Sequence, residues 1–489
     1  MKFSFKNIII IFVINFISFT IKAQEQFQVQ LQRKFAELPI SVVSDENGNY
    51  IIASQITDYI GQKQITWLLK ISKEGSLLKE KIYDKDRDNC VTKLLKINNN
   101  EFISLGIYKS DTSVYFDYWI QSFDTELNIN WEKKHYTRCY KAARESAIIN
   151  SDNEIITTGH NWFQNTNKGV AFVYKISISG ELLDTSYITG GLPYTFDVLE
   201  KTNKTGYYLF ALGTKYYTND ASQLIEVNNN LDFESVKKIS ESLNNANSAL
   251  WLSDTTFIVT GDKWNQITNK HDVGIAISDT IGHVLYSKML SIGTQEERMG
   301  FFKNLDYKFK DKIYFVSTTN INIASWPFGQ TTPSQIWVNC FNDTLGLNWQ
   351  QLIGGDFYYA AQTVLATDDG GCLVLGTKYD YNQNYDYDMF ITKFDQYGNY
   401  TSNIVEMPNL SNTITLYPNP CNTTFTIKLP DSYSSGQIWV YNIFGKQVLM
   451  ETINTNKQTI NVENLAKGIY VYKYIVDNIE IEKGKFVKQ

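Results

Sequence analysis

The chain has 489 residues, more than one ordinary hydrophobic core accommodates, so its length predicts two or more domains. Hydrophobic residues make up 43% and charged residues 20%, a globular composition that excludes a disordered chain. The net charge of -6 excludes a basic surface large enough for nucleic acid.

The N-terminus has the parts of a signal peptide. Lys2 and Lys6 precede an apolar stretch, Ile8–Ile21, and Ala23 supplies a small residue for cleavage. An apolar stretch of 14 residues fits a signal peptide better than a membrane span. We expect residues 1–23 to be removed on export; a retained membrane anchor is the alternative.

Seven repeats of about fifty residues follow. Each has an apolar run that ends near Gly, such as EFISLG, and then an apolar strand with a polar turn, such as WIQSFDTEL. Aligning the second run places seven apolar residues in register: Ile71, Phe123, Ile176, Val227, Ile277, Phe341 and Phe394. The intervals are 52, 53, 51, 50, 64 and 53, and an inserted loop between Thr318 and Gln335 accounts for the long one.

The repeat predicts an all-β propeller with seven blades. Each unit contains four short strand-like runs separated by Gly, Asn and Asp turns, which is the pattern of one blade. Aromatic residues at 14%, with 32 Tyr, also favour strands. A solenoid is the alternative, but it usually shows shorter repeats with a ladder of identical residues.

The two ends of the repeat region predict a closed ring. The last repeat stops after its third strand, FITKFDQYGN, and the N-terminal VQLQRKF resembles the fourth strand of other repeats. We therefore expect Val29–Phe35 to supply the outer strand of the seventh blade, which protects a sheet edge. The propeller is then expected to occupy residues 24–403.

The chain has five cysteines, and none forms a CxxC pair, so a zinc ribbon or a thioredoxin-like motif has no support. Cys90 and Cys139 fall in successive connections from one repeat to the next, on the same face of the expected propeller. We predict them to be neighbours and a candidate disulfide, with two free thiols as the alternative.

Known catalytic motifs are absent: the four histidines form no HExxH, and there is no GxSxG or sialidase-type Asp box. FDTELNINW and FNDTLGLNW resemble the tryptophan-docking repeats of quinoprotein propellers, but only two repeats keep the Trp. We predict that Trp131 and Trp349 pack between blades rather than serve a quinone cofactor.

One acidic stretch alternates oxygen-bearing side chains and is a weak calcium candidate: Asp380, Asn382, Asn384, Asp386 and Asp388. It lacks the Gly and Glu positions of an EF-hand, so a polar hairpin turn is the alternative. We otherwise expect no metal and no cofactor.

The C-terminal part has its own strand pattern. Residues 404–414 predict a linker, and residues 415–489 contain six or seven short strands, which indicate a small immunoglobulin-like β-sandwich. Four features follow in order: YPNP, YNIFGKQV, LAKGIYVYKY and a terminal KFVK strand. The residues that carry this pattern are Tyr417, Pro418, Asn419, Pro420, Gly445, Gly468, Lys485 and Lys488.

This order resembles the C-terminal sorting domain (type A) of the type IX secretion system of Bacteroidetes. The resemblance implies transport across the outer membrane and contact with the secretion machinery. It also implies a surface sortase that removes the domain and leaves the protein secreted or on the cell surface. The repeats are similar to propellers of secreted proteins with this domain, which implies a fold but no activity.

Aromatic residues with polar neighbours recur in loops expected on one face of the propeller. This combination suits sugars or peptides, since it offers apolar stacking and directional hydrogen bonds. The ligand-binding candidates are Trp162, Tyr216, Trp264, Trp326, Tyr358, Arg144 and Arg298. The alternative is that these aromatics fold inward and cap the blades.

The sequence therefore predicts an exported propeller that binds a glycan or a surface protein. One alternative is a polysaccharide-acting hydrolase or lyase with its site over the channel. The residues to inspect for that alternative are Arg144, Glu145, Glu296, Arg298 and Asp356. A structural adhesin without a pocket is the third possibility.

Overall fold

A computed structural model describes the chain from residue 26 to 489 with several gaps. The described residues are 26–31, 36–57, 63–83, 87–110, 116–139, 145–163, 168–188, 194–211, 222–240, 243–292, 296–321, 332–382, 387–401, 404–406, 414–429, 436–476 and 479–489. Within them, the side chains of 137–139, 145, 161–163, 168–169, 240, 404–406, 476 and 479–482 are not described. These residues contain no helix long and apolar enough to cross a membrane. The expected signal peptide lies outside the described residues.

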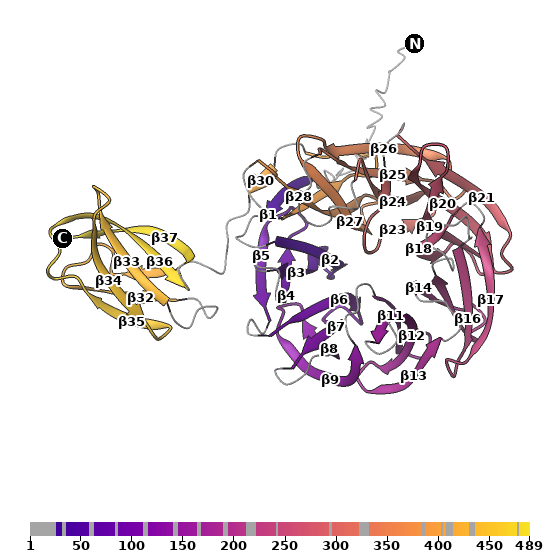
Figure 1. The fold of residues 1–489 in the computed structure, drawn as a ribbon, viewed down its shortest axis with the longest axis horizontal. Coiled ribbons are helices and arrows are strands. Elements are labelled where there is room, and N and C mark those ends of the chain that lie inside the picture. Colours follow the sequence, from indigo (N-terminus) through magenta and orange to yellow (C-terminus); the bar gives the residue numbers. More distant parts are fainter. Residues whose placement is uncertain are drawn as a thin grey trace, which may run out of the picture.

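Seven antiparallel sheets are arranged in a ring around a central channel (Figure 1). We call each sheet a blade and number the blades in chain order. The first three are β2 (Ala36–Ser44), β3 (Tyr50–Thr57), β4 (Gln64–Ile71), β5 (Leu77–Ile82); β6 (Asn89–Lys96), β7 (Glu101–Lys109), β8 (Phe116–Asp124), β9 (Ile129–Cys139); β10 (Glu145–Ile149), β11 (Glu154–Phe163), β12 (Lys168–Ser177), β13 (Leu182–Ile188). Each set runs outward from the channel in sequence order, as the repeat predicts.

Blades 4 to 6 continue the ring. Their strands are β14 (Thr195–Glu200), β15 (Gly206–Ala211), β16 (Ser222–Asn228), β17 (Phe233–Ser240); β18 (Asn245–Trp251), β19 (Thr256–Asn265), β20 (Lys270–Asp279), β21 (Val284–Leu290); β22 (Glu297–Met299), β23 (Leu305–Phe309), β24 (Lys312–Thr319), β25 (Gln335–Phe341), β26 (Leu347–Gly354). In blade 6 the innermost strand is split, and both β22 and β23 pair with β24. The backbone N–H groups of Phe301 and Phe302, between the two pieces, donate to the next blade at Ala361 and Gln362.

Blade 7 combines the two ends of the propeller. Its strands are β27 (Tyr358–Ala366), β28 (Cys372–Tyr379), β29 (Asp388–Phe394), β1 (Phe27–Leu31) and β30 (Ile404–Glu406). β1 pairs antiparallel with β29, with Gln28 opposite Thr392, so the N-terminal strand closes the ring. It lies at Phe27–Leu31 rather than Val29–Phe35, and 32–35 are outside the described residues. β30 adds a parallel fifth strand from the segment expected to be a linker.

The seven aligned apolar residues lie in the third strand of their blades and are all buried. The turn after each of them has the same geometry, with its fourth residue at positive φ: Gly75, Leu127, Gly180, Leu231, Gly282, Leu345 and Gly398. A leucine in this conformation costs roughly 1–2 kcal/mol, whereas burying its side chain contributes about 1.5–3 kcal/mol. Leu127, Leu231 and Leu345 are all buried, so packing offsets the strain.

The tryptophans of the outer strands join neighbouring blades, as the sequence predicts. Trp131 lies against Gly180 and Trp349 against Gly398, where an added Cβ would fall 2.4 and 2.6 Å from the indole atoms. Trp349 Nε1 also donates to the backbone oxygen of Gln396 at 3.1 Å. Each indole therefore needs a glycine in the next blade's turn, which gives these residues a packing role.

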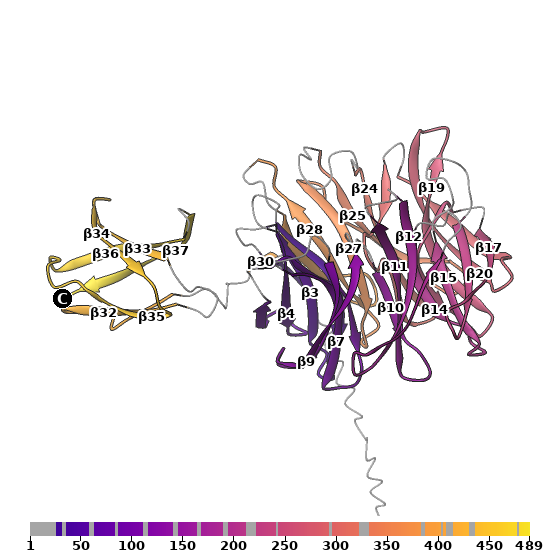
Figure 2. The ribbon, with the colours of Figure 1, turned by 60° about the horizontal axis from the view of Figure 1, so that its bottom comes forward.

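The C-terminal domain is a small sandwich (Figure 2). One sheet contains β31 (Thr415–Tyr417), β32 (Thr424–Lys428) and β35 (Lys457–Asn461); the other contains β33 (Gly436–Asn442), β34 (Gln447–Ile453), β36 (Gly468–Val476) and β37 (Ile479–Lys488). Phe425 from the first sheet and Phe486 from the second pack at 4.9 Å between ring centroids in a core of their own.

Candidate functional site

The hairpin between β19 and β20 carries the best-defined aromatic site on the loop face. Trp264 and His271 are paired across the hairpin, and their rings meet edge-to-face at 4.7 Å. The backbone N–H of Trp264 donates to Asn244 Oδ1 at 2.9 Å. The turn is fixed by Asn265, which bonds Asp272 at 2.9 Å. Trp264 is half-buried, so it combines a fixed position with an accessible part of its indole.

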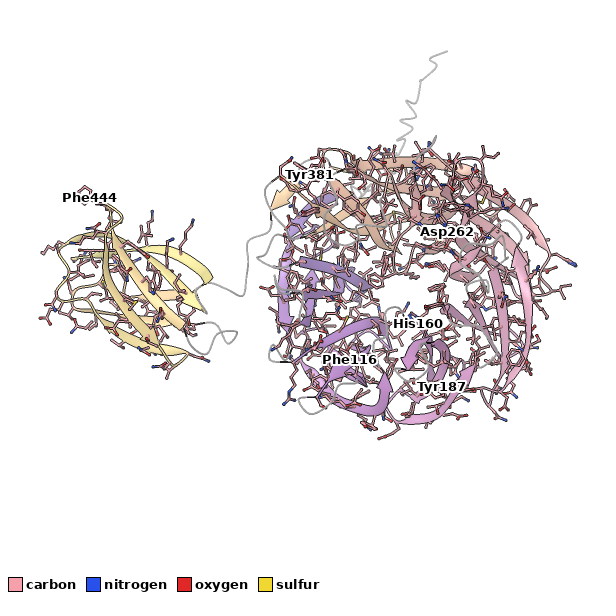
Figure 3. The ribbon with its side chains drawn as sticks, in the orientation of Figure 1. Phe116, His160, Tyr187, Asp262, Tyr381 and Phe444 are labelled. Atoms are coloured by element: carbon pink, nitrogen blue, oxygen red, sulfur yellow. The ribbon has the colours of Figure 1, made fainter. Side chains whose placement is uncertain are left out.

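A charged network lies beside this hairpin and links blade 5 to blade 6. Arg298 in β22 donates from Nη1 to Asp262 Oδ2 at 2.6 Å and from Nε to Glu296 Oε1 at 3.1 Å. Glu296 also accepts from His271, at 3.0 Å from the backbone N–H and 3.0 Å from Nδ1. Asn245 donates to the second oxygen of Asp262, which is labelled in Figure 3. Glu296 and Arg298, both singled out from the sequence, are thus in direct contact.

Two adjacent carboxyl groups of this region have opposite pKa shifts. Burial opposes the ionisation of Glu296, but hydrogen bonds from His271 and the charge of Arg298 outweigh it and lower its pKa. Burial raises the pKa of Glu297 to about 7, and the negative charges of Asp272 and Glu296 add to this effect. Glu297 Oε1 accepts the N–H of Ile292, whereas Oε2 has no hydrogen-bond partner among the described residues.

This arrangement suits binding better than acid–base chemistry. A half-exposed indole beside an ordered set of amide, carboxylate and guanidinium groups can stack on an apolar ligand face and bond its hydroxyls. Catalysis by two carboxyl groups needs both to reach the substrate. Glu296 is partly exposed, but Glu297 is fully buried, so these two carboxyl groups cannot form such a pair.

Four of the predicted ligand-binding side chains cannot be placed. Arg144, Tyr216 and Trp326 lie outside the described residues, as does the side chain of Trp162 in β11. The side chain of Glu145 is likewise not described. Asp356 is exposed in blade 7, where it hydrogen-bonds Tyr359. No described contact joins it to the Glu296–Arg298 network.

Tyr358 is placed in the interior instead of on the loop face. It is fully buried and packs edge-to-face on Tyr387 at 6.3 Å, and Tyr387 stacks on Tyr379 at 4.8 Å. Tyr108 is also buried, in contact with Trp119 at 5.9 Å. At these two positions the aromatic side chains fold inward and cap the blades, which is the alternative to a ligand-binding role.

The acidic stretch of blade 7 does not form a calcium loop in its described part. Asp380 Oδ1 accepts the N–H of Asn382 at 2.9 Å, a local turn contact. Asp388 lies in β29 and accepts from Gln30 at 2.6 Å. Asn384 and Asp386 lie outside the described residues. Among the described residues, no group of three or more His, Cys, Asp or Glu side chains could hold a metal ion.

The predicted disulfide is not tested by the structure. Cys90 is a buried thiol whose sulfur donates to Gln55 Oε1 at 3.3 Å. Cys139 belongs to β9, but its side chain is not among those described. The Cys90–Cys139 pair therefore stays a prediction.

In the C-terminal domain, the YPNP segment lies against the end of the chain. Asn419 Oδ1 accepts the N–H of Val487 at 2.9 Å, and its amide donates to the backbone oxygen of Lys485 at 3.4 Å. Cys421 continues this pairing, since its N–H donates to the oxygen of Val487 at 2.8 Å and its oxygen accepts from Gln489 at 2.8 Å. The first and last motifs of the domain are therefore one structural unit.

The remaining motif residues have simpler positions. Tyr417 ends β31, Pro418 and Pro420 flank Asn419, and both X–Pro bonds are cis. Lys485 is exposed on β37, whereas Lys488 is buried. Gly445 adopts a φ of 75° in the turn between β33 and β34, where Phe444 is 87% exposed (Figure 3), and Gly468 begins β36.

His271 and Asp262 were not among the site residues predicted from the sequence. Both become visible only through the register of the β19–β20 hairpin, which brings position 264 opposite position 271. The polar turn NQITN between two apolar runs is the signal that could have located this hairpin.

The chain matches solved structures at low identity and with TM-scores below 0.5. A fungal alcohol oxidase of the AA5 family, in complex with copper, is 12% identical with a TM-score of 0.45, over 95% of this chain and 99% of that one. The β-propeller domain of the trilobed protease from Pyrococcus furiosus is 9% identical with a TM-score of 0.43, over 75% and 96%. The phage phi92 endosialidase is 8% identical with a TM-score of 0.44, over 95% and 87%. None of these activities transfers to this chain at such similarity.

No curated protein sequence matches the chain. Residues 415–489 match the family model of the secretion system C-terminal sorting domain, the segment in which YPNP and the terminal strand are paired. This domain implies contact with the type IX secretion machinery, and hence secretion or a place at the cell surface. Together with the ring of seven blades, it identifies the chain as a β-propeller protein sorted by the type IX secretion system.

Proposed function

We propose that the exported propeller is a binding protein for glycans and that its contact surface is the loop face around Trp264. The observation that carries the proposal is the half-buried Trp264, fixed at its edge by His271 and flanked by the Glu296–Arg298–Asp262 network. A sugar ring offers an apolar face for the indole and hydroxyl groups for the charged side chains.

The charge state of the network supports a neutral, hydroxyl-rich ligand. Arg298 is matched by Asp262 and Glu296, so the network has no uncompensated positive charge to attract an anionic polymer. A protein segment is a second ligand class that Trp264 would accommodate. The hydrolase or lyase reading is less favoured here, since Glu297 is buried and Glu296 is held ionised.

Export supports the same proposal. A surface glycan or a polymer in the medium is within reach of a protein at the cell surface or outside the cell. We also propose that residues 1–23 are removed as a signal peptide and that a surface sortase removes residues 415–489. Mass spectrometry of the protein recovered from the medium or the cell surface would give both new termini.

The test is a glycan array probed with the purified mature chain and with Trp264→Ala. We expect binding to one group of neutral glycans and at least a tenfold loss of affinity in Trp264→Ala. Tyr397→Ala is the matched control, because Tyr397 is 70% exposed but lies in the turn after β29, at the opposite end of a blade. Equal binding by Trp264→Ala and the parent chain would refute this site, and an array without hits would refute the glycan class.

A further inference from the structure

The innermost strands line an open cavity of about 130 Å³ in the central channel. Its walls come from β2, β6, β10, β14 and β18, and from Phe302 and Lys303 in the break between β22 and β23. A water molecule occupies about 30 Å³ of liquid, so the cavity has room for a small polyatomic ion. Trp264 does not line it, so the cavity is distinct from the proposed glycan site.

The cavity has two lysines and one carboxylate in its wall, and the carboxylate already accepts three hydrogen bonds. Asp197 Oδ1 accepts from Ser146 Oγ at 2.5 Å and from the N–H of Val198 at 2.9 Å. Its Oδ2 accepts the N–H of Ala249 at 2.7 Å. Asp197 therefore joins blades 3, 4 and 5 by hydrogen bonds and has little capacity left to accept from another donor.

The two lysines differ in their partners. Lys303 Nζ donates to Asp306 Oδ1 at 2.8 Å, and the other oxygen of Asp306 accepts the N–H of Ala366 at 2.8 Å. For Lys93, no hydrogen-bond acceptor or ion-pair partner is found among the described residues. Burial lowers the pKa of Lys93 to about 8, and the positive charge of Lys303 adds to this effect, while Asp197 and Asp306 oppose it. At neutral pH the cavity thus contains an ammonium group without a direct hydrogen-bond acceptor among the described residues, and Asp197 and Asp306 compensate its charge only in part.

Two hydroxyl groups add neutral donors to the same wall. Ser41 Oγ accepts the N–H of Leu94 at 3.0 Å, and Ser248 Oγ accepts the N–H of Asn304 at 3.2 Å. Each hydroxyl uses its oxygen in this way and keeps its own proton to donate. Both residues line the cavity. The wall therefore presents spare donors, while its one carboxylate already accepts three hydrogen bonds.

We propose that the central cavity binds a small oxyanion, such as phosphate or a short carboxylate, through Lys93 and Lys303, with Ser41 and Ser248 as neutral donors. Lys93 is half-buried, and a half-buried cation without a direct acceptor is unfavourable. An anion of this size supplies the missing charge and acceptors. The anion also joins β6 to the break in blade 6 across the channel, so it stabilises the closed ring. This site lies outside the proposed glycan surface and does not depend on it.

The test is titration of the mature chain with phosphate, sulfate and malonate at low ionic strength, by calorimetry and by thermal unfolding. We expect one site and an unfolding temperature that rises with anion concentration. Phosphate and sulfate bound more tightly than malonate would identify a tetrahedral oxyanion, and the reverse order would identify a carboxylate. An anion-independent unfolding temperature together with no heat of binding would overturn the proposal.

Lys93→Met and Lys310→Met are the decisive pair, since Lys310 is an exposed lysine at the turn after β23. Lys93→Met should lose at least tenfold in anion affinity, whereas Lys310→Met should bind like the parent chain. Without anion, Lys93→Met should unfold at the same temperature as the parent or higher, because it removes a half-buried charge that has no direct partner among the described residues. This separates loss of the site from loss of the fold. Equal affinity in Lys93→Met and the parent would also overturn the proposal.

Discussion

Phe27 packs against Gly75 so closely that an added Cβ on Gly75 would lie 2.6 Å from Cγ of Phe27. This contact joins blade 7 to blade 1 and repeats the contacts of Trp131 with Gly180 and of Trp349 with Gly398. The strand that closes the ring therefore also supplies the aromatic clamp on the next blade. Gly75 has a φ of 94°, so a side chain there would be strained as well as crowded.

We expect Phe27→Ala to lower the free energy of unfolding of the propeller by about 3–5 kcal/mol, since it removes a buried aromatic side chain from the closure. Urea denaturation followed by tryptophan fluorescence gives the difference. Tyr397→Ala, on an exposed turn of the same blade, should change stability by no more than about 0.5 kcal/mol. If both variants lose equally little free energy of unfolding, the contact of Phe27 with Gly75 does not stabilise the closed ring.

Glu297 should make the stability of the chain depend on pH. Its folded pKa of about 7 lies above the usual 4.5, so the folded state binds more protons than the unfolded state between these values. Stability from this group is fully present below pH 4.5 and is lost as the pH rises through 7. At about 1.4 kcal/mol per pH unit, the loss is roughly 3 kcal/mol.

Glu297→Gln should therefore be more stable than the parent above pH 7, with the difference disappearing near pH 4.5. The amide keeps an oxygen for the N–H of Ile292, so the contact at Oε1 is retained. Thermal unfolding across pH 4.5 to 9 measures the difference. A constant difference between the two chains over this range would contradict the assignment.

Lys93 should also make stability depend on pH, but in the opposite direction to Glu297 and at higher pH. Its folded pKa of about 8 lies below the usual 10.5, so the unfolded state binds more protons between these values. Stability contributed by this group rises from pH 8 to 10.5, by up to roughly 3 kcal/mol. Lys303, Asp197 and Asp306 are the charged groups that face it.

In buffers without oxyanions, Lys93→Met should exceed the parent in stability at pH 7, and the two should converge above pH 10.5. Anion affinity of the parent should fall as the pH rises above 8, because the deprotonated amine no longer carries the charge. Calorimetric titration at pH 7 and pH 9.5 checks the second effect. Equal affinity at both values would exclude Lys93 as the ligand.

Asn419→Ala should reduce export. The substitution removes the acceptor for Val487 and the donor to Lys485, so the end of β37 loses about 1–3 kcal/mol of local stability. Cell fractionation should show the variant retained inside the cell envelope, as for a chain that ends before residue 415. Gln447→Ala, on an exposed position of β34, should be exported normally. Normal export of Asn419→Ala would show that the contact between YPNP and the end of β37 is not needed for sorting.

Most of the fold could be predicted because each blade repeats the same physical constraints. Six of the seven aligned residues, Ile71 among them, fill the same buried position in their third strands, so their spacing reveals the blades. In blade 5 the alignment is one residue out, because Ser278 rather than Ile277 holds this position. The closing strand was predicted in role but placed two residues late, because the pattern VQLQRKF does not show where pairing with β29 begins. The split in blade 6 was missed, since residues 301–303 bond to blade 7 through backbone groups that carry no sequence signal.

The site residues were harder to predict, because tertiary packing decides which aromatic side chains remain accessible. Trp264 and Tyr358 both follow the same loop pattern, yet one is half-buried and the other is fully buried among tyrosines. Lys93 and Lys303 are 210 positions apart and look like ordinary strand lysines in the sequence. They share a cavity only because the ring closes, a relation that no local pattern contains.

The pairing of Gln28 with Thr392 has a consequence for the timing of maturation. Residues 364 positions apart must meet before blade 7 is complete, so an incomplete chain cannot finish the ring. The sorting domain is synthesised soon after this closing region. The chain therefore completes its propeller shortly before its export address is made, and a product that terminates before β29 has neither.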